Sequence, residues 1–274
     1  MWVRTTPYPG ADRLILVRIA RFTTDEDPRF GVVGEADGVT VIAAITGDPL
    51  YAGVQLTGEK LALDDVRLLA PVLPRSKVIG IGRNYAAHAA ELGNEVPAEP
   101  LVFLKPNTSV TGPGDPILYP DFTEDLHYEG ELAVVISRIC KDVPAESAAQ
   151  VIHGYTVAND VTARDRQKSD GQWSRAKGAD GFCPLGPWIE TDLDVSDLRL
   201  TTTVGDRVVQ DGRTSDMVHK VPDLIAYVSS FMTLLPGDVI LTGTPEGVGP
   251  MNPGDEVSVT VEGIGTLTNK VVSK

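Results

Sequence analysis

Cysteine and long apolar runs are scarce in this sequence. Cys140 and Cys183 are the only cysteines, too few for a disulfide framework and without the spacing of a metal site. No apolar run approaches the roughly 18 residues that a membrane span needs, and the first residues lack the basic-then-apolar pattern of a signal peptide. We therefore expect a cytoplasmic protein that is stabilised by its own hydrophobic core.

Basic residues are also fewer than acidic residues. Lys and Arg total 24 against 38 Asp and Glu, which gives a net charge of −14. Proteins that bind the phosphate backbone of nucleic acids, or anionic membranes, depend on clustered Lys and Arg. The charge balance therefore argues against nucleic acid and membrane partners. A small anionic substrate stays compatible, because a bound cation and a few basic residues set the field inside a pocket.

Several common catalytic motifs are missing. The sequence has no Gly-x-x-x-x-Gly-Lys-Ser/Thr loop, no Gly-x-Ser-x-Gly elbow and no His-x-x-x-His pair. Gly80-Ile-Gly82 follows an expected strand, but Tyr85 stands where a dinucleotide-binding loop has its third glycine. These absences argue against a P-loop enzyme, an α/β-hydrolase, a zinc peptidase and a dinucleotide-binding domain.

Glycine and proline are abundant instead, with 27 and 20 residues in a chain of 274. They separate short apolar runs that predict strands at residues 14–20, 30–34, 39–43, 101–104, 128–137, 151–159, 198–204, 238–242 and 256–261. Only two or three helices are expected, including 85–92 and 222–234, the latter with Leu224, Ile225, Val228 and Phe231 on one face. The sequence thus predicts a mostly β protein with a few helices, divided into a small β-rich N-terminal domain over 1–70 and a larger domain over 71–274.

The helix expected over 85–92 carries two residues suited to proton transfer. Asn84 precedes it as a candidate N-cap, and Gly93 follows it as a stop signal. His88 and Glu91 are three residues apart and therefore share one side of the helix. Glu91 can orient and polarise His88 as a general base. The alternative is a solvated helix face without a catalytic role.

Two glutamates begin an otherwise apolar strand. Glu129 and Glu131 are two residues apart, so strand alternation places them on the same face. Buried together, two carboxylates repel each other unless a cation or a proton lies between them. The alternative is a wet strand end. By the same alternation His127 shares this face and is a conceivable further ligand.

A third carboxylate ends another expected strand. Asp160 follows the apolar run 151–159, and Arg164 comes four residues later. This arrangement can hold a metal and an anion side by side. Three carboxylates offer the oxygen ligands that Mg²⁺, Mn²⁺ and Ca²⁺ prefer, and they leave open positions for water and substrate.

Four segments carry a family resemblance: residues 128–136 (YEGELAVVI), 159–167 (NDVTARDRQ), 173–187 (WSRAKGADGFCPLGP) and 235–249 (LPGDVILTGTPEGVG). In this order and spacing they closely resemble the fumarylacetoacetate hydrolase superfamily over about 77–274. The nearest branch contains oxaloacetate decarboxylases, acylpyruvases and 2-hydroxyhepta-2,4-diene-1,7-dioate isomerases. The resemblance implies a mixed β-sandwich roll, a homodimer, and one Mg²⁺ or Mn²⁺ per active site, with Ca²⁺ as a substitute in crystals.

The resemblance also implies roles for individual residues. The implied metal ligands are Glu129, Glu131 and Asp160. The residues implied to bind the substrate are Arg164, Gln167, Lys177 and Thr244. The implied catalytic residues are His88, Glu91 and Lys177.

The resemblance implies that the enzyme acts on small 2-oxo or 2-hydroxy-enoic dicarboxylates and forms an enolate that the metal stabilises. One form is oxaloacetate decarboxylation or acylpyruvate C–C hydrolysis. The alternative is the 2-hydroxyhepta-2,4-diene-1,7-dioate isomerase or 5-carboxymethyl-2-oxo-hex-3-ene-1,7-dioate decarboxylase reaction of aromatic catabolism, and keto–enol tautomerisation is a third outcome of the same intermediate. An inert binding protein on this scaffold predicts a broken triad, whereas all three carboxylates and Lys177 are present.

The sequence departs from the hydrolase that names the superfamily. That enzyme uses an aspartate in the loop before the helix, whereas no carboxylate lies between Gly80 and Glu91 here. Fumarylacetoacetate itself is therefore not the expected substrate. Lys105 also fits the family pattern, either as a structural ion pair or as a substrate contact.

Overall fold

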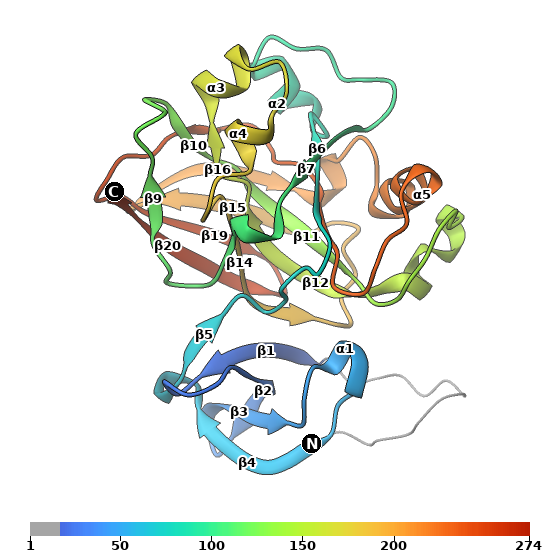
Figure 1. The fold of residues 1–274 in the computed structure, drawn as a ribbon, viewed down its shortest axis with the longest axis vertical. Helices are drawn as coiled ribbons and strands as arrows, with labels where there is room; N and C mark the ends of the chain where they lie inside the picture. Colours follow the sequence, from blue (N-terminus) through green and yellow to red (C-terminus); the bar gives the residue numbers. More distant parts are fainter. Residues whose placement is uncertain (1–16) are drawn as a thin grey trace.

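A computed structural model describes residues 17–274, and strands dominate it as predicted (Figure 1). The N-terminal strands form a lobe at one end of the molecule, and the short helices α2, α3 and α4 gather at the other (Figure 1). The α-helices are α1 (Pro49–Ala52), α2 (Ala86–Glu91), α3 (Arg164–Ser169), α4 (Ser174–Lys177) and α5 (Val221–Phe231). Four 3₁₀ helices join them: η1 (Leu63–Asp65), η2 (Asn107–Ser109), η3 (Ala145–Val151) and η4 (Thr214–Asp216).

The N-terminal lobe is an antiparallel meander. It consists of β1 (Arg18–Thr23), β2 (Arg29–Ala36), β3 (Val39–Ile45) and β4 (Leu56–Ala62), with β5 (Arg67–Leu69) returning to pair with β1. Asp37 and Gly38 both have positive φ, which suits the right-handed twist of the β2–β3 hairpin. The first strand was expected over 14–20. It begins at Arg18, and residues 14–16 lie outside the described residues.

The lobe continues into a large central sheet, because β1 pairs with β14. The strand order is β4-β3-β2-β1-β14-β12-β11-β17-β6-β7, with β5 and β8 attached beside it. The remaining members are β6 (Val78–Gly82), β7 (Leu101–Lys105), β8 (Val110–Thr111), β11 (Gly130–Ile136), β12 (Ile152–Asn159), β14 (Cys183–Glu190) and β17 (Val239–Leu241). Every residue of β11 is buried, which accounts for its apolar side chains on both faces.

A five-stranded sheet covers one face of this central region. Its order is β16 (Arg207–Arg213), β15 (Arg199–Val204), β19 (Glu256–Val261), β20 (Gly265–Ser273) and β9 (Ile117–Tyr119). Leu132 and Val134 of β11 pack with Leu200 and Val259 of this sheet in one core, while Ala133 on the other face packs in a second core. A small third sheet joins β13 (Thr162–Ala163), β10 (Leu126–Tyr128) and β18 (Gly249–Pro250). The predicted β-sandwich arrangement is thus confirmed.

The two helices predicted from the sequence are both present, with corrections at their ends. In α5, Leu224, Ile225 and Val228 are buried as expected, but Phe231 is 52% exposed at the last residue of the helix. After α2, Gly93 adopts a positive φ, and the N–H groups of Gly93 and Asn94 return to the carbonyls of Ala90 and Ala89. Asn84 does not cap α2, because its side chain bonds to other loops.

Candidate active site

The strand predicted over 128–137 is broken at Glu129, between β10 and β11. The backbone N–H of Glu129 donates to Asn159 Oδ1 at 3.0 Å, and that of Gly130 donates to Gln210 Oε1 at 2.9 Å. A Cβ at Gly130 would lie 2.3 Å from Thr202 Oγ1, so only glycine fits this break. Gly130 faces Thr202 and Val259, the side on which Leu132 packs, so Glu129 and Glu131 share the opposite side as alternation predicts. The break between β10 and β11 sets the direction of Glu129.

Glu129, Glu131 and Asp160 nevertheless converge. One oxygen from each lies within 4.8 Å of the others, and all three residues are at most 4% exposed. Asp160 arrives at the end of β12, where its N–H donates to the carbonyl of Glu129 at 2.8 Å. Oxygen atoms alone make up this group, which is the donor chemistry that suits a hard divalent cation. His127 is not a member, because its ring bonds to Asp125 at 2.7 Å.

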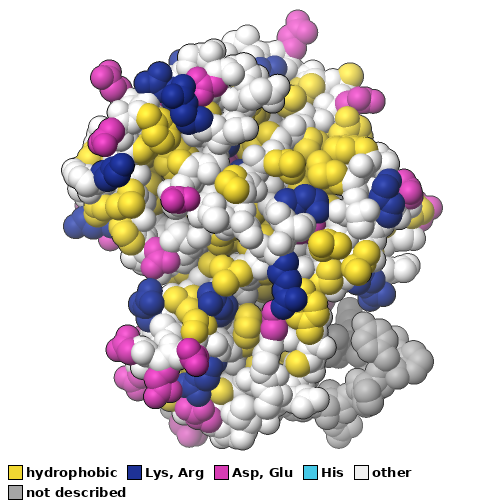
Figure 2. All heavy atoms as spheres, viewed as in Figure 1, with side chains coloured by type: hydrophobic (Ala, Val, Ile, Leu, Met, Phe, Trp, Pro, Cys, Tyr) yellow, Lys and Arg dark blue, Asp and Glu magenta, His cyan; other side chains and the backbone are white. Residues whose placement is uncertain are grey.

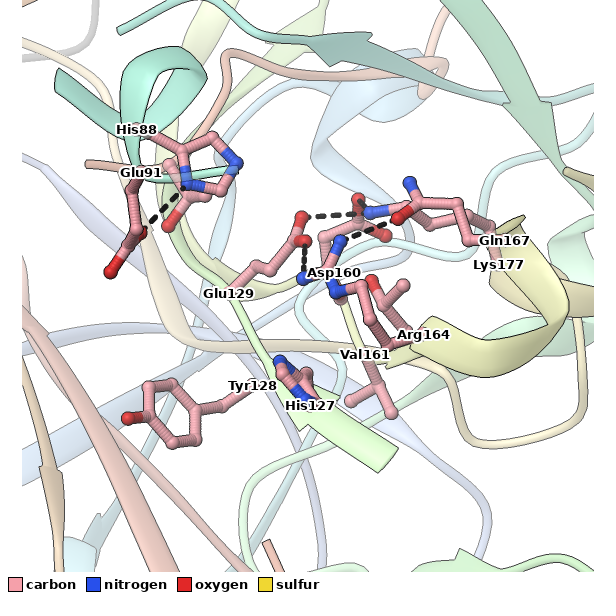
Figure 3. A network of polar contacts seen from close by, with 12 residues as sticks. His88, Glu91, His127, Tyr128, Glu129, Asp160, Val161, Arg164, Gln167 and Lys177 are labelled. Carbon is pink, nitrogen blue, oxygen red and sulfur yellow. Dashed lines mark hydrogen bonds and ion pairs between the residues drawn. The ribbon is translucent and has the colours of Figure 1, made fainter. Parts of the chain in front are cut away.

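Every carboxylate oxygen of this group except Glu131 Oε1 accepts a hydrogen bond from a protein donor. Glu129 Oε1 accepts from Arg164, Glu131 Oε2 accepts the Gly243 N–H at 2.7 Å, and Asp160 Oδ1 accepts from Lys105. The second oxygens of Glu129 and Asp160 share the Lys177 ammonium, at 2.7 and 2.5 Å, in the network shown in Figure 3. Glu131 Oε1 has no hydrogen bond among the described residues. One oxygen from each residue lies within 4.8 Å of the others, so a cation bound here would compete with Lys177 for Glu129 and Asp160.

The charges of this group perturb one another. Burial raises the pKa of Glu129, but Lys177 and Arg164 outweigh burial, so the pKa lies well below its usual range. Burial and the charges of Asp160 and Glu129 raise the pKa of Glu131 well above its usual range. A divalent ion bound by this group would oppose the rise and favour the carboxylate.

The two lysines differ in their surroundings. Lys105 is 1% exposed, and its ammonium also donates to the Phe182 carbonyl at 2.8 Å, away from the cavity wall. Of the two roles considered for Lys105, the structure supports the structural ion pair with Asp160. Lys177 lines the cavity, and its Nζ lies 5.0 Å from the centre of the Phe103 ring. The ammonium of Lys177 is therefore the one placed to meet a substrate.

A cavity of about 470 Å³ opens over the three carboxylates. Its wall includes all nine residues assigned by the family resemblance: His88, Glu91, Glu129, Glu131, Asp160, Arg164, Gln167, Lys177 and Thr244. Arg164 and Gln167 come from α3, and Arg164 Nη1 donates to Gln167 Oε1 at 2.5 Å. Phe103 and Trp173, packed edge to face at 5.4 Å, add an apolar wall. The sequence analysis did not single out these two aromatic residues.

His88 and Glu91 reach the cavity from α2. His88 Nδ1 lies 3.5 Å from Glu91 Oε2, which is longer than a hydrogen bond (Figure 3). Glu91 accepts the Gly247 N–H on both oxygens, at 3.1 and 3.2 Å, which attaches α2 to the loop after β17. Burial lowers the pKa of His88, and Arg164 and Lys177 lower it further against the charge of Glu129. The imidazole is therefore neutral near pH 7 and able to accept a proton.

The Thr244 hydroxyl is bonded within the protein. Its hydroxyl donates to the Gly130 carbonyl at 2.8 Å and accepts from Gln210 Nε2 at 2.8 Å. The hydroxyl therefore ties the loop after β17 to the break before β11, and a substrate contact of Thr244 stays a prediction. Gln210, 2% exposed, completes this link, although its pattern in the sequence is that of an ordinary strand residue.

Asn84 is a second residue whose role comes only from the structure. Its side chain donates to the carbonyls of His219 and Thr242, at 3.0 and 2.8 Å, and accepts the His219 N–H at 2.8 Å. These bonds fix the loop that leads into α2. Arg83, the preceding residue, has a φ of 57°, a left-handed conformation that this clamp holds in place.

Comparison with known proteins shows the family. A model described as "Fumarylacetoacetate (FAA) hydrolase C-terminal" matches residues 77–272. The chain belongs to the fumarylacetoacetate hydrolase family. A second model, described as "Rv2993c-like, N-terminal", matches residues 17–71. Among residues 17–274, no helix is long and apolar enough to cross a membrane.

Relatives in this family are named as enzymes. A structure of 5-carboxymethyl-2-hydroxymuconate delta-isomerase from Mycobacterium smegmatis is 54% identical, with a TM-score of 0.87 over 94% of this chain and 100% of that one. Oxaloacetate tautomerase FAHD1, mitochondrial, of Oryza sativa subsp. japonica is 49% identical over 72% of this chain and 89% of its own length. Fumarylpyruvate hydrolase from Pseudomonas aeruginosa, solved with Mn²⁺ and pyruvate, is 32% identical, with a TM-score of 0.70 over 76% of this chain and 92% of that one.

Proposed function

We propose that this protein is a divalent-metal-dependent enzyme that moves a proton at the carbon next to the carbonyl of a small 2-oxo dicarboxylate, with oxaloacetate as the first substrate to test. One observation carries the proposal: three inward carboxylate oxygens and a neutral histidine lie on the wall of one cavity. The names of the rice and M. smegmatis relatives, a tautomerase and an isomerase, support this kind of reaction. Decarboxylation and acylpyruvate cleavage, expected from the sequence, would use the same groups.

Glu129, Glu131 and Asp160 would hold Mg²⁺ or Mn²⁺. When bound, the ion supplies a Lewis acid that polarises the substrate's carbonyl oxygen. The donor set fits such an ion, because all three residues present carboxylate oxygens: Glu131 Oε1 has no hydrogen bond among the described residues, and the ion would share with Lys177 the second oxygens of Glu129 and Asp160. A relative solved with Mn²⁺ supports the same ion class.

Charge explains how an acidic protein would attract a dianion. Three carboxylates face three cations, Lys105, Lys177 and Arg164, so the group is formally neutral by itself. A divalent ion gives it a charge of +2, which matches a dicarboxylate. Arg164, whose buried Nε has no hydrogen bond among the described residues, and Lys177 are the donors placed to bind and orient its carboxylates.

His88 is the group that would accept and return the proton. Its pKa is lowered, so the imidazole is neutral near pH 7, and the Glu91 carboxylate stands 3.5 Å from Nδ1 to stabilise the imidazolium as it forms. A distance of this length is common in catalytic pairs before a substrate tightens them. Gly247 fixes Glu91 through its N–H, so that α2 holds the pair over the cavity.

The aromatic wall favours a second candidate. The cavity of about 470 Å³ is large for a four-carbon acid, and Phe103 and Trp173 offer an apolar surface to a longer unsaturated chain. We therefore also propose isomerisation of 2-hydroxy-diene dioates, the class to which the substrate named for the M. smegmatis relative belongs.

An assay on chelated and then Mg²⁺- or Mn²⁺-restored protein tests these proposals. Oxaloacetate is followed for enol absorbance and for pyruvate separately, with an acylpyruvate and a hydroxy-diene dioate in parallel. We expect metal-dependent enol formation, and a His88→Ala variant that loses about 10²–10⁴-fold in turnover while it still binds metal and oxalate. Unchanged turnover in this variant would reduce the His88–Glu91 pair to a packing role. Gel filtration tests the homodimer, which the family resemblance predicts.

A further inference from the structure

A second cavity, of about 240 Å³, lies where the N-terminal lobe meets the central sheet. Its wall combines residues of β1, β2, α1, the segment 71–75, β12 and β14, and it shares no residue with the catalytic cavity. Lys and Arg side chains lie among hydrophobic atoms along this seam in Figure 2. Because the lobe and the sheet form one continuous set of strands, the cavity is a fixed feature of the fold.

Arg21 is a charged residue on the face of β1 that otherwise packs against the central core. Ile19 and Arg21 point to the same face of the strand. Ile19 packs in the central core with Val72 and Ile189, which also line this cavity. Arg21 therefore places a guanidinium at the edge of an apolar core. Burial lowers the pKa of Arg21 and the charge of Asp48 raises it, and the described residues provide its side chain with no hydrogen bond or ion pair. The half-buried guanidinium therefore keeps its donors available to a ligand.

The other polar groups of the cavity point to an anion. Arg75 also lines it, above the Tyr51 ring at 4.2 Å. His153 Nε2 is buried and has no hydrogen-bond partner among residues 17–274. Asp48 is the one acid of the wall, and its Oδ1 accepts the Leu50 N–H at 3.0 Å. The wall thus carries a formal charge of +1, in a chain whose net charge is −14.

We propose that this cavity binds a small organic monoanion, with its carboxylate on Arg21 and its apolar body against the core. An arginine fork suits a carboxylate, and His153 offers a second polar contact. Seven of the eleven wall residues are apolar, which favours an organic anion over inorganic phosphate: Phe30, Pro49, Leu50, Pro71, Val72, Leu73 and Ile189. The volume is below the roughly 300–1,000 Å³ of drug-sized sites, so the ligand is small. The site stands independently of the proposed catalytic function.

Benzoate is the probe for this site, because it joins one carboxylate to an apolar ring. Isothermal titration of the full chain, with and without Mg²⁺ and oxalate in the catalytic cavity, measures its affinity and stoichiometry. We expect one Arg21-dependent benzoate per chain in both conditions, with binding about tenfold or more weaker in Arg21→Gln. Arg207→Gln, which removes an exposed arginine outside both cavities, is the matched control and keeps the wild-type affinity.

Three results would overturn the proposal. One is the absence of benzoate binding to the wild type, and another is an unchanged affinity in Arg21→Gln. The third is displacement of benzoate by inorganic phosphate at equal concentration, which would contradict the ligand class. Circular dichroism checks that Arg21→Gln folds. If it does not, Arg75→Gln replaces it, since Arg75 is exposed at the rim, and an unchanged affinity there also overturns the site.

Discussion

Asp238 and Glu131 are both buried carboxylates, but they differ in what their oxygens contact. Asp238, 0% exposed just before β17, accepts four hydrogen bonds: from Ser76 Oγ at 2.5 Å, the Lys77 N–H at 3.2 Å, Lys77 Nζ at 2.5 Å and the Leu235 N–H at 2.9 Å. Glu131 accepts one, from Gly243. Its other oxygen has no hydrogen bond among the described residues and belongs to the group that surrounds the catalytic cavity.

The number of hydrogen bonds that each carboxylate accepts distinguishes the structural role of Asp238 from the metal-binding role proposed for Glu131. A buried carboxylate that serves stability is saturated with donors, because any unpaired charge costs several kcal/mol. Of the three carboxylates proposed to hold a metal, Glu131 is the one that keeps an oxygen without a hydrogen bond among the described residues. Asp238 fixes the turn before β17, whereas Glu131, with its raised pKa, retains an unmet demand for positive charge.

Glu131→Gln should have the largest effect on function. The substitution removes a ligand charge, so we expect metal affinity to fall by about 100-fold or more and metal-dependent turnover to disappear. The metal-free protein should not become less stable, because burial and the charges of Asp160 and Glu129 disfavour the charged form of Glu131. Titration with Mn²⁺ and urea unfolding of the chelated protein measure the two effects. Full metal-dependent activity in this variant would contradict the metal assignment.

Asp238→Asn should have the opposite pattern. Removing one partner of a buried ion pair leaves Lys77 without its counter-ion, so we expect a loss of about 3–5 kcal/mol in the free energy of unfolding. Metal affinity of the folded variant should match the wild type, because Asp238 lies outside the cavity wall. Urea unfolding measures the loss of stability, and Mn²⁺ titration measures the metal affinity. Weakened Mn²⁺ binding in Asp238→Asn would contradict a purely structural role for Asp238.

Lys105→Met tests whether a residue behind the cavity positions a ligand. Lys105 holds Asp160 Oδ1, so its loss should let the carboxylate rotate and weaken Mn²⁺ binding by about 10–100-fold. Lys141→Met, at an exposed lysine on the surface, is the control and should leave Mn²⁺ binding unchanged. Equal affinities in the two variants would show that Lys105 contributes only to packing.

The smallest expected effect is on pH dependence. The proposed reaction requires neutral His88, and burial holds the pKa of His88 below its usual 6.5. As pH falls, kcat/KM should therefore stay level through the usual histidine range and decline only at lower pH, as the imidazole gains a proton. A profile of kcat/KM measures this, and a decline centred above 6.5 would contradict the burial of the catalytic base.

Much of the fold follows from local patterns in the sequence. Turn residues separate the strands, Asp37-Gly38 shapes a hairpin, and Gly93 ends α2. The division at residue 70 stays a prediction, although the two family models meet near it, at 17–71 and 77–272. Phe231 was expected in a buried face and is exposed, because helical periodicity does not show where the supporting sheet ends.

The sequence by itself determined the strand-rich class, the family and the candidate ligands, because these depend on residue type and spacing along the chain. Tertiary structure decided the break at Glu129, the Asn84 clamp, the use of the Thr244 hydroxyl and the free oxygen of Glu131. Each of these depends on hydrogen bonds between segments at least 30 residues apart. Local pattern carries no information about such partners, and their geometry exists only once the sheets have packed.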